Sequence, residues 1–189
     1  MAISRLVPAA AMLLSVLLPP APAADLPRKA DFTINMVDGK TLSLSQYRGR
    51  AVILAFILTT CSHCQNAVGV LTKLQNEYGP RGLQVLASAI ENNAQAAVPN
   101  FVSTFKPSFP VGYSQGQVAG GFLQPTGKSP MMPLLAFIDR QGMLQAQTEG
   151  EEPFFNDLEG NLRKQIELLL KGPVPPKKSV PSKATAPKK

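Results

Sequence analysis

The stretch that decides the fold spans 51–65 and reads A-V-I-L-A-F-I-L-T-T-C-S-H-C-Q. Its first eight residues are apolar and rich in branched side chains, which predicts a strand that is buried on both faces of a sheet. The run ends at Cys61, His63 and Cys64, the only cysteines and the only histidine of the chain. The sequence therefore brings its most reactive side chains to the end of a central strand.

The elements around this stretch predict an α/β fold. From Cys64 to Tyr78 apolar residues recur at helical spacing, and a buried strand over 83–90 and a helix over 94–105, interrupted near Pro99, complete a β-α-β unit with parallel strands. The other predicted elements are a hairpin over 31–50 turning at Asp38-Gly39, a short strand over 110–113, a weak helix over 115–122, two hairpin strands over 134–139 and 143–148, and a closing helix over 155–170. We expect one domain over 24–171, with a central mixed sheet flanked by helices and an N-terminal β-hairpin.

Residues 1–23 carry the three parts of a secretory signal. Arg5 gives a basic start, 6–18 is an apolar core, and Ala21-Pro22-Ala23 is a small-residue cleavage site. We expect cleavage before Ala24 and a periplasmic or otherwise exported protein, or a membrane-anchored one if the signal stays uncleaved. The apolar run is shorter than the roughly 18 residues of a spanning helix, which favours cleavage.

The formal net charge of +7 is unevenly distributed. Residues 24–171 hold thirteen Lys and Arg against twelve Asp and Glu, whereas 172–189 hold five lysines, five prolines and no acid. Such a segment cannot bury enough apolar surface to offset its ordering entropy, so it is predicted to be a disordered basic tail. We expect no nucleic-acid partner, at most a weak contact of the tail with an anionic surface, and a monomer.

A Cys-x-x-Cys pair at the start of a helix has a specific chemistry. Backbone N–H groups and the helix dipole stabilise a thiolate on the first sulfur, which attacks a partner. The second sulfur, within one turn, then attacks the mixed disulfide and closes a ring. This predicts Cys61 as the nucleophile, Cys64 as the resolving thiol, and a reversible Cys61–Cys64 disulfide.

Two other interpretations of the pair are a metal site and a structural disulfide. Zinc needs four ligands, and His63, wedged between the cysteines, is the only other soft candidate, so we expect no metal and no cofactor. A bridge across one helical turn closes too small a loop to stabilise the fold much, so a redox role is favoured over a staple.

The chain resembles the exported TlpA-like group of thioredoxin-fold thiol oxidoreductases over 31–170. Residues 56–64, F-I-L-T-T-C-S-H-C, stand where this family has F-W-A-x-W-C-x-x-C, and 131–142, M-M-P-L-L-A-F-I-D-R-Q-G, stand where it has x-x-P-x-x-x-x-I-D-x-x-G. The resemblance implies a thioredoxin-like fold, a cis Pro133 beside the active disulfide, and Met132 against Cys61.

The sequence departs from the family around the thiols. Thr60 replaces the usual tryptophan, Ala67 the glutamate of many relatives, and Ala55 the buried aspartate of thioredoxin. With these carboxylates absent, water, the leaving thiolate of the partner, or His63 remain as proton acceptors for Cys64.

Ser62 and His63, between the cysteines, are predicted to modulate the pair, as are Thr60, Met132 and Pro133. A histidine here resembles the C-P-H-C of oxidising periplasmic catalysts, and a cation beside Cys61 would favour the reduced form. The alternative is a solvent-facing turn residue without a role.

Three other functions share this fold. A peroxiredoxin needs Thr or Ser three residues before its cysteine and Pro seven before, where this chain has Leu58 and Leu54. A copper-delivery protein needs a wider cysteine spacing and a distant histidine, and a redox-inactive binding module would have lost the chemistry. We therefore expect an exported thiol-disulfide oxidoreductase that acts on protein thiols or disulfides and is recycled by a redox partner.

Overall fold

The apolar run before the cysteines is the central strand of a mixed sheet. A computed structural model describes residues 26–125, 131–150 and 153–173. Within them, β4 (Ala51–Ile57) lies between β5 (Leu83–Ala89), to which it is parallel, and β7 (Leu134–Ile138), to which it is antiparallel. Every residue of β4 is buried. The predicted central strand and β-α-β unit are confirmed, whereas the predicted signal and nearly all of the predicted tail lie outside the described residues.

The sheet extends on both sides of this centre in the order β1-β8-β7-β4-β5-β6-β2-β3. The remaining strands are β1 (Arg28–Lys29), β2 (Thr33–Asn35), β3 (Thr41–Ser43), β6 (Val111–Tyr113) and β8 (Met143–Thr148). Strands β2 and β3 form the predicted N-terminal hairpin, with Gly39 at the turn at a φ of 82° that suits glycine. The pairing of β1 with β8 was not predicted, because two residues carry no readable pattern.

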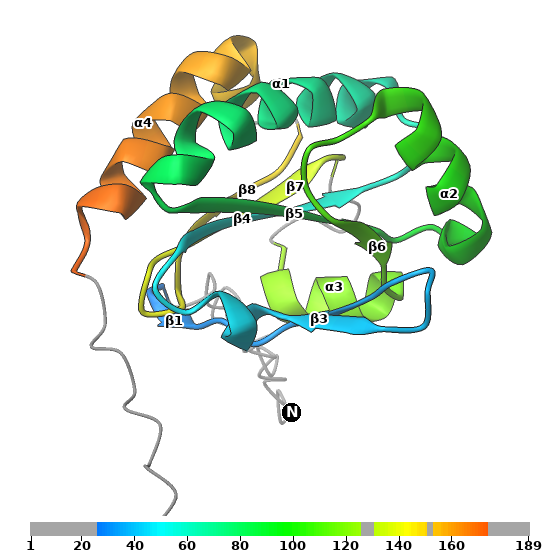
Figure 1. The fold of residues 1–189 in the computed structure, drawn as a ribbon, viewed down its shortest axis with the longest axis horizontal. Coiled ribbons are helices and arrows are strands. Elements are labelled where there is room, and N and C mark those ends of the chain that lie inside the picture. The colour runs from blue at the N-terminus through cyan, green and yellow to red at the C-terminus, as the bar shows by residue number, and fades with distance from the viewer. Residues whose placement is uncertain (1–25, 126–130, 151–152, 174–189) are drawn as a thin grey trace, which may run out of the picture.

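Helices cover both faces of the sheet, as Figure 1 shows. Helices α1 (Ser62–Tyr78) and α4 (Leu158–Lys171) lie on one face and α3 (Gly116–Leu123) on the other, while α2 (Ala94–Phe105) connects β5 to β6. Short 3-10 segments are η1 (Leu44–Tyr47), η2 (Gly79–Arg81) and η3 (Pro153–Asp157). In the described part of the chain, no helix is long and apolar enough to cross a membrane.

The two-residue period of β4 divides the core into two layers. Ile53 and Ile57 pack into the cluster that contains α1 and α4, whereas Leu54 and Phe56 pack into the cluster that contains α3. Both layers consist of buried hydrophobic residues, which explains why the strand reads as a continuous apolar run in the sequence.

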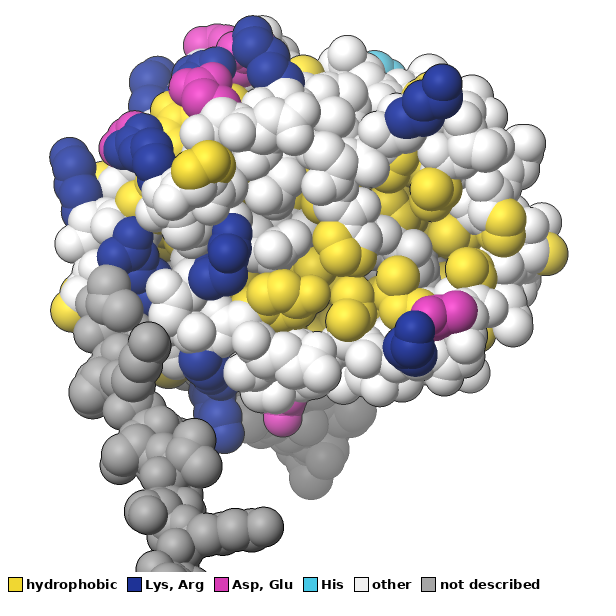
Figure 2. Space-filling model, in the orientation of Figure 1, with side chains coloured by type: hydrophobic (Ala, Val, Ile, Leu, Met, Phe, Trp, Pro, Cys, Tyr) yellow, Lys and Arg dark blue, Asp and Glu magenta, His cyan; other side chains and the backbone are white. Residues whose placement is uncertain are grey.

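Charge on the surface is concentrated where α1 and η2 meet α4. Figure 2 shows charged side chains gathered at the upper left, over α4 and the adjoining part of α1, with hydrophobic side chains across the centre and the right of the same face. The ion pairs between these elements are Lys73–Glu159, Arg163–Glu77 and Arg81–Glu167. They are at least partly exposed, so solvent screens them and they contribute little to stability.

Two predicted helix features are wrong in detail. Helix α2 runs through Pro99 without the predicted interruption. Pro99 and Gln95 are both exposed, so water can hydrogen-bond to the Gln95 carbonyl that lacks a partner. Helix α1 begins at Ser62, two residues before the predicted start, because Cys61 acts as its N-cap residue.

Candidate active site

The turn between β4 and α1 places Cys61 at the N-terminal end of α1. The Cys61 amide donates a hydrogen bond to the Leu58 carbonyl at 3.2 Å, and the Gln65 amide donates to the Cys61 carbonyl at 3.0 Å. The Gln65 side chain also donates to the Thr59 carbonyl at 3.0 Å. These bonds fix the chain from 58 to 61 against the first turn of α1.

Cys61 presents its sulfur as the cap of α1. Its Sγ accepts a hydrogen bond from the Cys64 amide at 3.4 Å. An N-terminal amide and the positive end of the helix dipole both favour negative charge at this atom. The side chain is partly exposed, so a partner sulfur can reach it. This is the geometry that a nucleophilic thiol requires.

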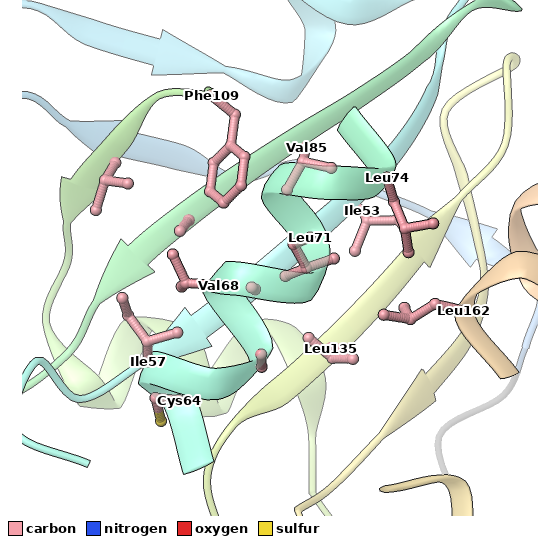
Figure 3. Packing of buried hydrophobic residues seen from close by; sticks show 14 of the residues in the cluster. Ile53, Ile57, Cys64, Val68, Leu71, Leu74, Val85, Phe109, Leu135 and Leu162 are labelled. Carbon is pink, nitrogen blue, oxygen red and sulfur yellow. The ribbon is translucent and has the colours of Figure 1, made fainter. Parts of the chain in front are cut away.

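Cys64 lies one helical turn further on and faces the core. Figure 3 shows it beside Ile57, at the end of the row formed by Val68, Leu71 and Leu74 along α1. Its exposed fraction is 0%. Burial raises the pKa of the Cys64 thiol to about 12, with further increases from the Cys61 thiol and the charge of Glu91, whereas a hydrogen bond from the Leu58 backbone lowers it. The two thiols are free in this structure.

The residues that replace the family's carboxylates make the surroundings of Cys64 apolar. Ala55 and Ala67 have exposed fractions of 0% and 1% and belong to the same core cluster as Cys64. Desolvation by this apolar environment is the main reason why the thiol resists ionisation.

Glu91 was not identified from the sequence, and the structure places it at this site. Its Oε1 accepts a hydrogen bond from the Thr59 amide at 3.0 Å and another from the Thr59 hydroxyl. One signal could have found it. Glu91 is the only acidic residue between Glu77 and Asp139, and it follows a predicted strand parallel to the one that leads to Cys61. Parallel neighbours end at the same edge of a sheet.

Pro133 lies at the same edge of the sheet as the thiols. The Met132–Pro133 peptide bond is cis, as the family resemblance implies. Because Phe56 of β4 pairs with Leu134 of β7, Pro133 precedes β7 at the end where β4 leads into the Cys61 turn. Met132 and Cys61 pack against the same core cluster, and a direct contact between them stays a prediction.

Thr60, Ser62 and His63 are exposed around Cys61. The loss of the usual tryptophan therefore leaves a small polar side chain at position 60, and His63 faces solvent in the first turn of α1. Their predicted influence on the thiol pair is not tested by this geometry.

Two hollows adjoin the site. One, of about 390 Å³, is lined by Thr59, Thr60 and Gln65 on one side and by residues of α2, including Phe101 and Phe105, on the other. The second, of about 530 Å³, lies beyond Glu91 among polar side chains at the starts of α2 and α3.

Comparison with known proteins identifies the family. The Redoxin family model matches residues 22–162. Thiol-disulfide oxidoreductase ResA of Bacillus thuringiensis (strain Al Hakam) is 30% identical over 134 residues, which cover 71% of this chain and 74% of that relative. The crystal structure of a thiol:disulfide interchange protein DsbE from Chlorobium tepidum aligns with a TM-score of 0.64 and 27% identity, covering 77% of this chain and 98% of that one.

A second Chlorobium tepidum structure, a thiol:disulfide interchange protein of the thioredoxin family, aligns with the same TM-score of 0.64 at 22% identity, and it supports the fold alone. The family match, the relatives and the observed sheet agree with one another. The chain belongs to the Redoxin family and is a TlpA-like, thioredoxin-fold thiol-disulfide oxidoreductase.

Proposed function

We propose that the protein is exported and exchanges disulfides with protein thiols through Cys61 and Cys64. One observation carries the proposal: a partly exposed sulfur caps α1, and a fully buried sulfur follows it by one turn. This asymmetry supports different roles for the two thiols, because only the outer one can meet a partner. Export rests on the signal-like sequence of residues 1–23.

In the reducing direction, the Cys61 thiolate attacks one sulfur of a substrate disulfide. The substrate S–S bond breaks, its electron pair leaves on the departing substrate thiolate, and a mixed disulfide forms at Cys61. Cys64 then attacks Cys61 Sγ, forms the Cys61–Cys64 bond and releases the second substrate thiolate. The protein has been oxidised by two electrons and the substrate reduced by two. The reverse sequence oxidises a dithiol.

Reduction of insulin by dithiothreitol tests the proposal. The wild-type protein is expected to accelerate the reaction, and Cys61→Ser to abolish the acceleration. Reduced Cys64→Ser, freed of dithiothreitol and mixed with insulin, is expected to retain attack and to accumulate mixed disulfides that a gel without reductant resolves. A Cys61→Ser variant as active as the wild type would refute the assignment of the nucleophile.

Export is tested separately. The full chain, expressed in a bacterium with an outer membrane, is expected to fractionate with the periplasm and to begin near Ala24 on N-terminal sequencing. An intact Met1 on a protein confined to the cytoplasm would contradict export without affecting the chemistry.

A further inference from the structure

Strand pairing brings Glu91 beside the turn that carries the cysteines. In the parallel pair of β4 and β5, Ile57 lies opposite Ala89, and the Ile90 amide donates to the Ile57 carbonyl at 3.1 Å. Both segments continue past their strands at the same edge of the sheet. Two residues beyond this pair, Glu91 therefore reaches Thr59. Thr59 is itself buried, with an exposed fraction of 8%.

One carboxylate oxygen of Glu91 accepts hydrogen bonds, and the other accepts none within the described residues. Oε1 accepts both hydrogen bonds from Thr59, from the amide and from the hydroxyl. Oε2 is buried and has no hydrogen-bond partner within the described residues. A buried carboxylate oxygen without a partner is costly and calls for an explanation.

The resolving step requires a group that accepts the proton of Cys64. Burial raises the pKa of the Cys64 thiol well above neutral pH, so this thiol must lose a proton before or during its attack. Ala55 and Ala67 are apolar, so neither can accept the proton. Glu91, by contrast, is bonded to Thr59, two residues before Cys61, and its charge is among the causes that raise the pKa of Cys64.

We propose that Glu91 accepts the proton of Cys64 when that thiol attacks the mixed disulfide at Cys61. The inference rests on the proposed function of the pair and adds a residue to it. As the Cys64–Cys61 bond forms, the Cys64 proton passes to Oε2, directly or through one water molecule, and the Cys61–partner bond breaks. The electron pair leaves on the partner thiolate, which is then protonated by solvent.

A proton on Glu91 has a route to bulk water. The residue also lines the polar hollow of about 530 Å³, whose other walls are mostly amide and hydroxyl side chains. Tyr113 of β6 is the other titratable residue in the described lining of this hollow, and Cys64 is a titratable group outside the lining whose pKa the charge of Glu91 raises. The acceptor can thus be reset from the surface while Cys64 stays dry.

Reaction of the reduced protein with 5,5′-dithiobis(2-nitrobenzoate) tests the proposal, because each step releases one coloured thiolate. The first phase reports attack by Cys61 and the second reports resolution by Cys64. In Glu91→Gln, whose side-chain carbonyl can still accept from Thr59, the first phase is expected to stay within about twofold of the wild type. The second phase at pH 7 is expected to slow by about tenfold or more.

A second readout separates proton acceptance from a merely electrostatic or structural role. Removing the negative charge of Glu91 lowers the pKa of Cys64, measured by NMR of its labelled Cβ in a Cys61→Ser background. Electrostatics alone would therefore quicken the second phase, whereas loss of the acceptor slows it. Between pH 7 and 9 the second phase in Glu91→Gln should rise by nearly tenfold per pH unit, and in the wild type by much less.

Asp31→Asn is the matched control, since it removes one carboxylate charge at an exposed position between β1 and β2. Both of its phases should match the wild type. A Glu91→Gln variant with an unchanged or faster second phase would overturn the role of Glu91. A wild-type protein without any second phase would instead overturn the proposed Cys61–Cys64 exchange, so the two failures are distinguishable.

Discussion

At the residue scale, the positions of Cys61 and Cys64 on α1 give two identical side chains different chemistry. Cys61 is the N-cap of α1 and its sulfur stays partly exposed, whereas Cys64 points from the first turn into the core. The same three-residue spacing also lets the Cys64 amide donate to Cys61 Sγ. Position on the helix therefore supplies an attacking sulfur and a protected one without any further residue.

The buried thiol makes the stability of the reduced protein depend on alkaline pH. The ordinary pKa of this thiol is 9.0, and burial raises it to about 12 in the folded state. Between these values the unfolded chain releases a proton that the folded chain retains, so the free energy of unfolding falls as pH rises from about 9 to about 12. Denaturant titrations of reduced protein should show this loss, and those of Cys64→Ala should lack it. Parallel curves for the two proteins would contradict the shift.

The His63 side chain is exposed, so solvent screens its charge from the thiol pair. We expect His63→Pro to lower the reduction potential of the Cys61–Cys64 pair by no more than about 30 mV, which is a tenfold change in the equilibrium with glutathione. Asn66→Ala, at an exposed position further along α1, is the control and should not change it. A much larger change for His63→Pro would show a stronger coupling than its exposure suggests.

At the element scale, much of the fold could be predicted from the sequence because the central strands are buried on both faces. The runs that became β4 and β7 are apolar throughout, that of β5 is broken only by Gln84 and Ser88, and the closing helix shows a clear helical period. The passage of α2 through Pro99 could not be predicted, because it depends on which side of the helix faces water. Glu91 was missed for a related reason: its role follows from strand register, which no local pattern contains.

The junction between the hairpin and the main sheet depends on Gly112 of β6. A Cβ at this position would lie 2.3 Å from the Asn35 carbonyl oxygen and 2.6 Å from a methyl carbon of Ile34, both on β2. Gly112→Ala should therefore lower the free energy of unfolding by about 1–3 kcal/mol, measured by urea denaturation.

Gly69→Ala is the control for this prediction. Gly69 is exposed in α1, and a Cβ added there would meet nothing within 4 Å. The substitution should raise the free energy of unfolding by about 0.5–1 kcal/mol, because alanine is the better helix former. Equal effects of the two alanines would contradict a tight β2–β6 contact.

Gly150, just after β8, contacts the backbone of Met131 and Met132, before Pro133. The Gly150 amide donates to the Met131 carbonyl at 2.8 Å, and a Cβ there would lie 2.6 Å from the Met132 carbonyl oxygen. Gly150→Ala should displace the backbone before Pro133 and reduce the rate of insulin reduction severalfold. Ala146→Gly, within β8, is the comparison variant, because it leaves this contact intact. An unchanged rate for Gly150→Ala would contradict a dependence of the reaction on the backbone position before Pro133.

At the scale of the whole molecule, the charge of the chain and its chemistry are separate. The ion pairs join α4 to α1 and η2, away from the cysteine end of α1, and the excess lysines belong to the C-terminal segment. Neither set contributes a charged side chain to the described lining of the two hollows beside the site. Catalysis should therefore depend little on the overall positive charge.

Removal of residues 174–189 tests this separation. The truncation deletes five lysines, and the predicted result is an unchanged rate of insulin reduction and an unchanged midpoint of thermal unfolding. Both can be measured on the purified full-length and shortened chains. A large loss of turnover would refute the prediction that the tail is dispensable for the reaction.

The eight-stranded sheet ends in very short outer strands, two residues in β1 and three in β3. These short strands offer an extended polypeptide few unpaired backbone groups for β-augmentation. A thiol-disulfide oxidoreductase with such edges can bind a partner through sulfur and release it without offering the partner a strand to pair with.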